Sequence, residues 1–249
     1  MSQEIAVVTG ASSGIGAATA NVLAQSGYHV IAAARRADRL REVAAQHPNI
    51  EAVELDVTSQ ASVDALANHL RNTNLSILIN NAGGAFDSAP VEASDPAIWS
   101  KTYEVNVVGA MRVTQALLPI IKQYGHGHLL FTTSTAGHAA YENGGSYVTA
   151  KAAEVAMVQT LRLELNGLPI RVTEIAPGMV KTEEFSAVRF GGDNEKAAKV
   201  YQGVEHPLVA EDIAEAIRWS VSLPAHVNVD SLIIRPIAQA ANHKVHRIS

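Results

Sequence analysis

Three glycines near the N-terminus stand between a short apolar run and an amphipathic helical stretch, in Thr9-Gly10-Ala11-Ser12-Ser13-Gly14-Ile15-Gly16. The apolar run spans residues 5–8, and the helical stretch spans residues 17–26. Glycines in such a turn let backbone N–H groups and a helix N-terminus approach a pyrophosphate closely. The turn therefore predicts a strand, a turn and a helix that bind a dinucleotide. The expected contacts are Gly10, Ser12, Ser13, Gly14, Ile15 and Gly16.

Beyond this first unit, apolar runs alternate with helical stretches. The apolar runs span residues 5–8, 29–33, 50–55, 77–79, 128–133, 170–175 and 232–234. The helical stretches span residues 17–26, 39–46, 62–71, 98–124, 146–165 and 211–222. Strands that alternate with helices imply right-handed crossovers and a parallel sheet covered on both faces. We therefore expect an α/β fold with a single doubly wound parallel sheet of about seven strands, forming one domain over residues 1–249.

The composition excludes several classes of function. A formal net charge of -5 argues against a polybasic nucleic-acid binder, and the absence of cysteine removes thiol nucleophiles and Cys-based zinc sites. No apolar run reaches the ~18 residues needed to span a bilayer, so we expect a cytoplasmic protein that does not bind membranes. We interpret His126 and His128, and likewise His243 and His246, as solvated surface side chains and expect no metal site.

The stretch 178–203 interrupts the alternation of strands and helices. It is polar, contains glycines, has no strand pattern and shows at most one weak helix, at 194–201. A loop of this length in a compact α/β domain is more often functional than a simple connector. We therefore expect a substrate lid near residues 178–203. Because ligands of doubly wound sheets bind beyond the carboxyl ends of the strands, reactive residues are expected directly after each strand.

Residues that follow the second, third and fourth predicted strands indicate how a dinucleotide would bind. Arg35 and Arg36 stand where an NAD site normally carries an acidic residue. Guanidinium groups suit a phosphate better than a hydroxyl, so the pair predicts NADP, although two arginines can also simply solvate a strand end. Asp56 can accept a hydrogen bond from the adenine amino group or can cap a turn. Asn81 is expected to contact the cofactor.

Hydride transfer to a ketone also needs a proton donor, which Tyr147-Val148-Thr149-Ala150-Lys151 provides. Tyr147 and Lys151, at i and i+4, share one face of a predicted helix. A tyrosine phenol normally ionises with a pKa of about 10, and an adjacent ammonium lowers that value toward neutrality. The alternative interpretation of this pair is a tyrosine at the protein surface beside a solvated lysine.

Two further polar residues stand at positions where chemistry is expected. Ser134 follows the fifth predicted strand, where its hydroxyl can hold a substrate oxygen. Asn106 lies inside an otherwise apolar helical stretch, where an amide is unfavourable without a purpose. Its side chain can lock a bent helix or anchor a water that relays protons from Lys151. Taken alone, each of these residues is as consistent with a structural role as with catalysis.

Together, these motifs resemble those of the classical short-chain dehydrogenases/reductases, in order and over the whole chain. The matching motifs are Thr9-Gly10-x-x-x-Gly14-x-Gly16, Asn80-Asn81-Ala82-Gly83, Asn106, Ser134, Tyr147-x-x-x-Lys151 and Pro177-Gly178. The resemblance implies a Rossmann-type sheet of seven strands, hydride transfer with a nicotinamide cofactor and a homotetramer. The spacing of the glycines differs from the TGxxGxxG of the extended members, so an epimerase is not expected.

The resemblance also implies a role for each catalytic residue. Tyr147 would be the general acid/base, Lys151 would assist it and bind the nicotinamide ribose, Ser134 would orient the substrate oxygen, and Asn106 would support a relay water. Ser13 departs from the pattern, because many NADP-using members carry Arg or Lys there. The cofactor cleft would also be lined by Val57, Ala82, Gly83, Pro177, Gly178, Val180 and Thr182.

Two segments, 182–190 and 223–228, resemble the NADP-dependent 3-hydroxy acid dehydrogenases that accept serine, allo-threonine and 3-hydroxyisobutyrate. We therefore expect oxidation of a small 3-hydroxy acid, with Arg189 as a clamp for the carboxylate. An ion pair of Arg189 with Glu183 or Glu184 is an equally weighted alternative. The wall of the substrate pocket is expected to include His138, Ala139, Ala140 and Tyr141.

Two other functions compete with this expectation. A general NADPH carbonyl reductase would act on uncharged ketones and would have no use for a carboxylate clamp. A non-catalytic NADP(H) sensor would bind the same cofactor, but it would not need a matched proton donor, cation and oxygen holder.

Overall fold

The computed structural model describes residues 3–182 and 184–248, and its centre is a parallel sheet of seven strands. The strand order is β3-β2-β1-β4-β5-β6-β9, with every neighbouring pair parallel. The strands are β1 (Ile5–Thr9), β2 (His29–Ala34), β3 (Ile50–Glu54), β4 (Leu75–Asn80), β5 (Gly127–Thr132), β6 (Ile170–Pro177) and β9 (Ser231–Ile234). The order changes direction between β1 and β4, and the predicted doubly wound sheet is confirmed.

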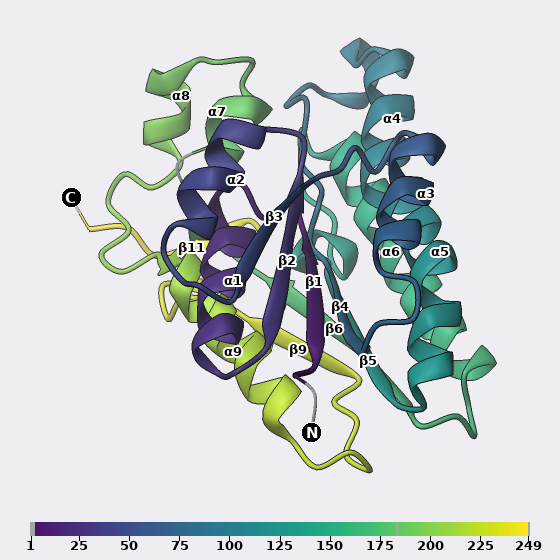
Figure 1. Ribbon diagram of the computed structural model, residues 1–249. Coiled ribbons are helices and arrows are strands. Elements are labelled where there is room, and N and C mark those ends of the chain that lie inside the picture. The colour runs from purple at the N-terminus through teal and green to yellow at the C-terminus, as the bar shows by residue number, and fades with distance from the viewer. Residues whose placement is uncertain (1–2, 183, 249) are drawn as a thin grey trace.

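Helices cover both faces of the sheet (Figure 1). One layer holds α1 (Gly14–Gln25), α2 (Ala37–Ala44) and α9 (Ala210–Ser222); the other holds α3 (Gln60–His69), α5 (Gly109–Tyr124) and α6 (Gly145–Glu164). Because successive strand residues face opposite sides, Val8 and Ile79 pack in the core beneath the first layer. Val7 and Leu78 pack in the core beneath the second layer. This alternation explains why the central strands are apolar throughout.

The stretch 98–124, predicted as one helix, consists of three segments. Helix α4 (Pro96–Tyr103) runs into a π-helical segment, Glu104–Val108, and then into α5. The stretch is helical as predicted, but the π-helical segment interrupts its regular α-helical pattern. The side-chain amide of Asn106, inside the π-helical segment, donates to the carbonyl oxygen of Thr102 at 2.8 Å, a contact that competes with the regular helical pattern.

The 178–203 segment is more regular than its sequence indicates. It contains β7 (Val180–Lys181), α7 (Phe185–Arg189) and α8 (Asn194–Lys199), and β7 pairs with β8 (Leu208–Val209). The weak helix predicted at 194–201 is present as α8, but the prediction of no strand and no further helix was wrong, because elements of two to six residues are too short to show a period. Figure 1 places α7 and α8 beyond the carboxyl ends of the central strands, across from α4.

Short elements complete the described chain. Two 3-10 turns, Val91–Ala93 and Thr135–Gly137, follow β4 and β5 in the chain. Near the C-terminus, β10 (Gln239–Ala241) pairs with β11 (Lys244–Val245) in a hairpin that the sequence did not indicate. The hairpin brings the side-chain oxygen of Gln239 to 2.8 Å from the backbone N–H of Met179. The start of the 178–203 segment is therefore held from the C-terminal side.

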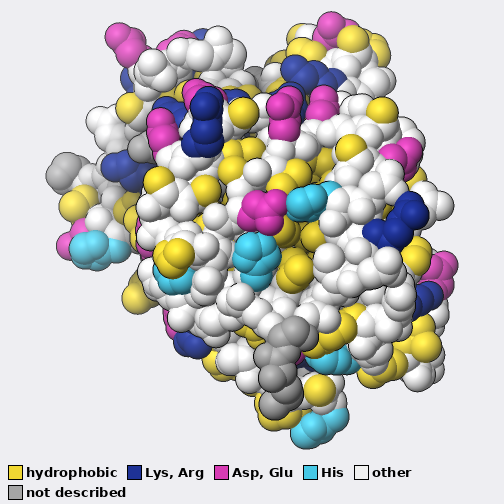
Figure 2. Space-filling model, viewed as in Figure 1, with side chains coloured by type: hydrophobic (Ala, Val, Ile, Leu, Met, Phe, Trp, Pro, Cys, Tyr) yellow, Lys and Arg dark blue, Asp and Glu magenta, His cyan; other side chains and the backbone are white. Residues whose placement is uncertain are grey.

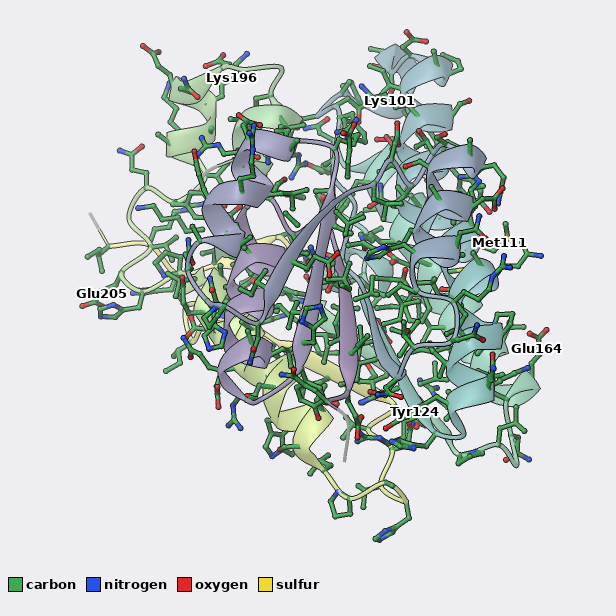
Figure 3. All side chains as sticks on the ribbon, viewed as in Figure 1. Lys101, Met111, Tyr124, Glu164, Lys196 and Glu205 are labelled. Carbon is green, nitrogen blue, oxygen red and sulfur yellow. The ribbon has the colours of Figure 1, made fainter. Side chains whose placement is uncertain are left out.

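The surface shows no large patch of a single charge on the face in view. Basic and acidic side chains are interspersed there (Figure 2). Figure 3 shows Lys196 and Lys101 on either side of the carboxyl-end edge, with Tyr124 and Glu164 toward the opposite end. None of the helices within residues 3–182 and 184–248 is long and apolar enough to cross a membrane.

One of the predicted surface histidines is buried. His128 lies on β5 with 2% exposure, and its Nε2 atom is 2.8 Å from the hydroxyl of Thr173. Burial lowers the pKa of His128 well below its usual value, so the ring is neutral. His126 also has a carboxylate neighbour, because its Nε2 atom lies 3.5 Å from Glu4. The interpretation of His128 as a solvated side chain was therefore wrong, whereas His126 is exposed, as expected.

Candidate active site

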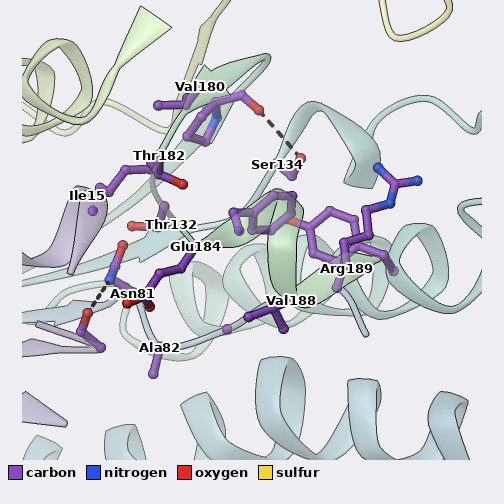
Figure 4. Close-up of a pocket in the computed structure, with 18 of the residues that line it drawn as sticks. Ile15, Asn81, Ala82, Thr132, Ser134, Val180, Thr182, Glu184, Val188 and Arg189 are labelled. Atoms are coloured by element: carbon purple, nitrogen blue, oxygen red, sulfur yellow. Dashed lines mark hydrogen bonds between the residues drawn. The ribbon is translucent and has the colours of Figure 1, made fainter. Parts of the chain in front are cut away.

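A cleft with a volume of about 620 Å³ opens at the carboxyl ends of the strands. Its lining includes all the residues predicted to contact a dinucleotide except the inward-facing Gly16. Figure 4 shows Ile15 and Asn81 on one side of the cleft and Ser134 and Arg189 on the opposite side. A cleft of this size lies in the ordinary range for cofactor and ligand sites.

The glycine turn forms the floor of the cleft at the start of α1. Gly10 and Gly14 have φ angles of +68° and +53°, which only glycine adopts at low cost. A Cβ at Gly16 would lie 2.4 Å from the carbonyl oxygen of Gly10, so no side chain fits there. Ser13, the N-cap of α1, makes no side-chain cap. The first N–H groups of the helix are therefore available to an anion.

A small network of hydrogen bonds joins the glycine turn to the end of β4. The Thr9 hydroxyl accepts from the backbone N–H groups of Asn81 and Ala82, both at 3.0 Å. The side-chain amide of Asn81 donates to the carbonyl oxygen of Thr9 at 3.0 Å. Asn81 lines the cleft, and its amide also holds the two strand ends together.

Arg35 and Arg36 directly follow β2. They line one end of the cleft, near the start of α1. Arg36 donates to the Ser12 and Ser13 hydroxyls at 2.9 and 3.0 Å, and forms an ion pair with Glu184 at 2.6 Å. The Ser13 hydroxyl also donates to Glu184, at 3.0 Å. The hydrogen bond from Arg36 lowers the pKa of Glu184 below its usual value. A carboxylate from the 178–203 segment therefore occupies the anion-binding side of Arg36.

Asp56 forms the wall next to this arginine pair. One of its carboxylate oxygens accepts from the backbone N–H of Thr58 at 2.9 Å and from the Thr58 hydroxyl at 2.8 Å. Burial works to raise the pKa of Asp56, but these bonds, together with Arg35, outweigh burial and lower it. Asp56 therefore caps a turn, one of its two predicted roles, while it also lines the cleft.

Helix α6 carries the tyrosine and lysine. Tyr147 is 7% exposed, and its ring packs edge-on against Phe185 at 5.7 Å between centroids. The Lys151 ammonium lies 5.8 Å from the centre of the Tyr147 ring. It donates to the carbonyl oxygen of Thr132 at 2.9 Å and to Glu154 at 2.7 Å. Lys151 is thus a buried side chain at the cleft wall, which excludes the alternative of a solvated surface lysine.

Asn106 is fully buried, and its side chain links the π-helical segment to the loop after β4 by hydrogen bonds. Its side-chain oxygen accepts from the backbone N–H of Gly84 at 3.1 Å, and its amide donates to the carbonyl oxygen of Gly84 at 2.9 Å. A Cβ at the neighbouring Gly83 would lie 2.5 Å from the Asn106 oxygen and 3.4 Å from the Lys151 ammonium nitrogen. The helix is interrupted at Asn106 by the π-helical segment, and the Asn106 side chain lies beside Lys151.

Ser134 begins the 3-10 turn after β5. Its side-chain oxygen accepts from the backbone N–H of Ala136 at 3.1 Å and lies 3.5 Å from the carbonyl oxygen of Pro177. Of the predicted wall residues, only Tyr141 lines the cleft. The expectation that His138, Ala139 and Ala140 shape it was wrong. The His138 ring lies 2.6 Å from Glu174 instead.

Arg189 of α7 reaches the cleft beside Tyr141 and Phe190, with its guanidinium carbon 5.3 and 5.7 Å from the two ring centres. Its Nε atom is buried and has no hydrogen-bond partner among the described residues. The predicted alternative, an ion pair with Glu184, was wrong, because Glu184 pairs with Arg36. Glu183, the other acid considered for it, lies outside the described residues.

Three acidic residues near the site were not predicted to make the contacts that they make: Glu154, Glu174 and Glu184. Glu154 is the buried partner of Lys151, and Glu174 accepts from Thr133 at 2.7 Å and contacts His138. Glu184 was considered only as a partner for Arg189. The i, i+3 spacing of Lys151 and Glu154 was the one available sequence signal, because the other contacts join distant parts of the chain.

The chain matches the short chain dehydrogenase family model over residues 4–190. It belongs to the short-chain dehydrogenase family. The predicted family and the predicted class of oxidoreductase are confirmed. The fold also agrees, because the chain superposes on the closed form of a serine dehydrogenase complexed with NADP+ with a TM-score of 0.92 and 38% identity, covering 98% of this chain and 100% of that chain.

Relatives of known and unknown activity are similar over nearly the full length. An uncharacterized oxidoreductase of Mycobacterium tuberculosis strain H37Rv is 48% identical over 96% of this short-chain dehydrogenase and 93% of the relative. An NADP-dependent 3-hydroxy acid dehydrogenase of Escherichia coli strain K12 is 38% identical, over 98% of this chain and 99% of the relative. The crystal structure of serine dehydrogenase from Escherichia coli superposes with a TM-score of 0.82 at 33% identity, covering 95% and 99% of the two chains.

Proposed function

We propose that this short-chain dehydrogenase oxidises a small 3-hydroxy acid of the serine, allo-threonine or 3-hydroxyisobutyrate type with NADP. The observation that carries the proposal is the meeting of Tyr147, Lys151 and Ser134 in one cleft with the glycine turn and Arg36. The NADP-dependent 3-hydroxy acid dehydrogenase and the NADP-bound serine dehydrogenase support the same cofactor and substrate class.

The residues of the cleft fit a bound NADP. The turn at Gly10 and Gly16 leaves no side chain in the way, and the N-terminus of α1 offers free N–H groups for the pyrophosphate. Arg35 and Arg36, with the Ser12 and Ser13 hydroxyls, provide donors for the 2'-phosphate at the adenosine end. We assign the remaining wall contacts to Ile15, Asp56, Val57, Asn81, Ala82, Gly83, Pro177, Gly178, Val180 and Thr182.

When bound, the nicotinamide supplies or accepts the hydride. Tyr147 takes the proton from the substrate hydroxyl during oxidation and returns it during reduction. Lys151 stabilises the ionised phenol and contacts the nicotinamide ribose. Ser134 holds the substrate oxygen, and Asn106 keeps the neighbouring loop and helix in place for a relay water.

Arg189 is the proposed clamp for the substrate carboxylate. Its guanidinium is held against Tyr141 and Phe190, which orients the group, while the buried Nε atom keeps an unused hydrogen among the described residues. A carboxylate that accepts this hydrogen would satisfy it with a strong charge-assisted bond. The 178–203 segment would then act as a substrate lid, since it carries Arg189.

A panel of substrates tests the proposal. The 3-hydroxy acids and the methyl esters of the same acids are compared with NADP at alkaline pH. We expect turnover of the acids, and we expect Arg189→Ala to raise their KM about 10- to 100-fold without affecting the esters. Lys196→Ala, which removes an exposed lysine of α8, is the matched control. Equal use of acids and esters, with no effect of Arg189→Ala, would contradict the carboxylate substrate.

One observation favours the alternative of a general NADPH carbonyl reductase. The substrate side of the cleft is lined by the apolar or aromatic groups of Tyr141, Phe185 and Val188, which suit an uncharged ketone. Preference for the esters in the same panel would support this alternative. Absence of turnover with every substrate, despite NADP binding, would favour a non-catalytic sensor.

We also propose a homotetramer, as in the family that the chain belongs to. Exposed apolar side chains lie on the helical layer opposite α1: Met111 of α5 is 46% exposed (Figure 3), and Leu163 of α6 is 79% exposed. Light scattering during gel filtration tests the number of subunits. A monomeric mass at micromolar concentration would contradict the proposal.

A further inference from the structure

A cluster of buried ionisable side chains lies behind Tyr147, and the proposed reaction leaves part of it without a role. Lys151 and Glu154, three residues apart on α6, form an ion pair at 2.7 Å with side chains only 4% and 2% exposed. A buried ion pair loses much of its attraction to the cost of desolvation, so it is weak evidence for a purely stabilising role. Its position beside a reacting phenol suggests a function.

The contacts of Lys151 determine where its ammonium group points. An ammonium has three N–H donors, and Glu154 and the carbonyl oxygen of Thr132 accept two of them. One donor is left for the cleft, which Lys151 lines. The carboxylate of Glu154 and the carbonyl of Thr132 therefore hold the ammonium at the cleft wall, 5.8 Å from the centre of the Tyr147 ring.

The charges around the pair are unbalanced. Glu154, Tyr147 and the buried Glu174 interact electrostatically with Lys151. Lys151 and Glu174 interact electrostatically with Glu154. Beyond them, the Glu174 carboxylate contacts the His138 ring, whose side chain is 27% exposed. The cluster thus holds two carboxylates against one ammonium, with His138 adding a charge only when it is protonated.

Burial and attraction act in opposite directions on the two partners. Burial works to lower the pKa of Lys151, but the negative charge of Glu154, with Tyr147 and Glu174, outweighs it and raises that pKa. Burial raises the pKa of Glu154, against the pull of Lys151. Each partner therefore holds its protons more tightly than it would in water.

We propose that Glu154 is a positioning residue, which anchors the Lys151 ammonium and sets the pH at which the Tyr147–Lys151 pair releases a proton. The inference rests on the proposed function of Tyr147 as general acid/base. A negative charge one hydrogen bond from the pair increases the affinity of the pair for its protons. Because the two groups interact, the pH of release belongs to the pair and not to either side chain. Removal of the charge therefore moves the release to lower pH, whichever group gives up the proton.

Three variants test the role of Glu154. Glu154→Gln keeps the shape and a hydrogen-bond acceptor but removes the charge, whereas Glu154→Asp keeps the charge. Glu174→Gln is the matched control, because it neutralises a buried carboxylate that is bonded to Thr133 and His138 and has no hydrogen bond to Lys151. If Glu154→Gln does not fold, Glu154→Met fills a similar volume without a charge and replaces it, with the same expected shift.

The first measurement is the pH profile of kcat/KM for alcohol oxidation with NADP. Activity rises with pH as the pair loses its proton. We expect this limb to move to lower pH by about one to two units in Glu154→Gln, and by less in Glu174→Gln. We expect Glu154→Asp to keep the limb close to that of the wild type. A lower plateau with an unmoved limb, or a limb moved to higher pH, would overturn the inference.

The second measurement does not depend on turnover. Tyrosinate absorbance in the ultraviolet is titrated for the NADP-bound protein, with Tyr147→Phe subtracted. If Tyr147→Phe removes no tyrosinate signal below the ordinary range of tyrosine, the proposed role of Tyr147 fails. If that signal is present and Glu154→Gln leaves it at the same pH, the proposed function stands and the role of Glu154 fails.

Discussion

The two ends of the cleft are built in opposite ways. At the end proposed to be catalytic, the paired Lys151 and Glu154 side chains are 4% and 2% exposed. At the end proposed to bind the adenosine, the paired Arg36 and Glu184 side chains are 42% and 31% exposed. A buried pair cannot lose one partner without leaving a charge in the interior, whereas an exposed pair exchanges partners at little cost. The first arrangement suits fixed chemistry, and the second suits a phosphate that arrives and leaves.

Removal of the buried cation is expected to have the largest effect. Lys151→Met leaves Glu154 buried without a partner. We expect this to lower the free energy of unfolding, measured by urea denaturation, by about 3–5 kcal/mol. Turnover should fall about 10²- to 10⁴-fold, because the ionised phenol loses its cation. The double variant Lys151→Met, Glu154→Leu should recover most of the stability but none of the turnover. Recovery of turnover in the double variant would show that Lys151 only stabilises the fold.

Removal of an exposed cation at the other end should affect binding alone. Arg36→Ala is expected to weaken NADP about 10- to 100-fold, because it loses a charge-assisted bond to the 2'-phosphate. The affinity for NAD and the stability should change little. Arg39→Ala, which removes an exposed arginine paired with Glu42, is the control. Calorimetric titration with both nucleotides measures these affinities. Equal losses of affinity for NADP and NAD would contradict the assignment of Arg36 to the 2'-phosphate.

The smallest expected effect comes from Glu184, which occupies the donors that we propose for the 2'-phosphate. Glu184→Gln should tighten NADP binding by up to about fivefold and leave NAD unchanged, since exposed ion pairs contribute about 0.2–1 kcal/mol. Because Arg36 lowers the pKa of Glu184, its carboxylate stays charged well below neutral pH. The gain should therefore persist down to about pH 5, and shrink as pH falls further or as salt is added. Weaker NADP binding in Glu184→Gln would mean that the carboxylate does not compete with the phosphate.

The sequence predicts motifs that depend on local spacing better than contacts that join distant segments. Motifs that act through local spacing were predicted from the chain alone: the glycine turn, the Tyr147–Lys151 pair on one helix face, and the strands that end at the cleft. The break at Asn106 was foreseen only as a bent helix, because a π-helical segment depends on its bonds to Gly84 and Thr102. Hydrophobic periodicity cannot show such bonds.

Contacts between distant segments were the least predictable. Glu184 is 148 residues from Arg36 in the chain, and His138 is 36 residues from Glu174. Neither pairing leaves a local pattern, so Glu184 was expected beside Arg189 and His138 was expected in the pocket wall. The short helix α7 was missed for a related reason, since five residues, Phe185–Arg189, do not complete two helical turns.

The most direct test of the account is a comparison of Tyr147→Phe with the wild type, in which cofactor binding and cofactor reduction are measured on the same samples. Loss of the hydroxyl should leave the affinity for NADP nearly unchanged and lower the rate of NADPH formation from a 3-hydroxy acid about 10²- to 10⁴-fold. A variant that still reduces the cofactor within about tenfold of the wild-type rate would contradict the assignment of proton transfer to Tyr147.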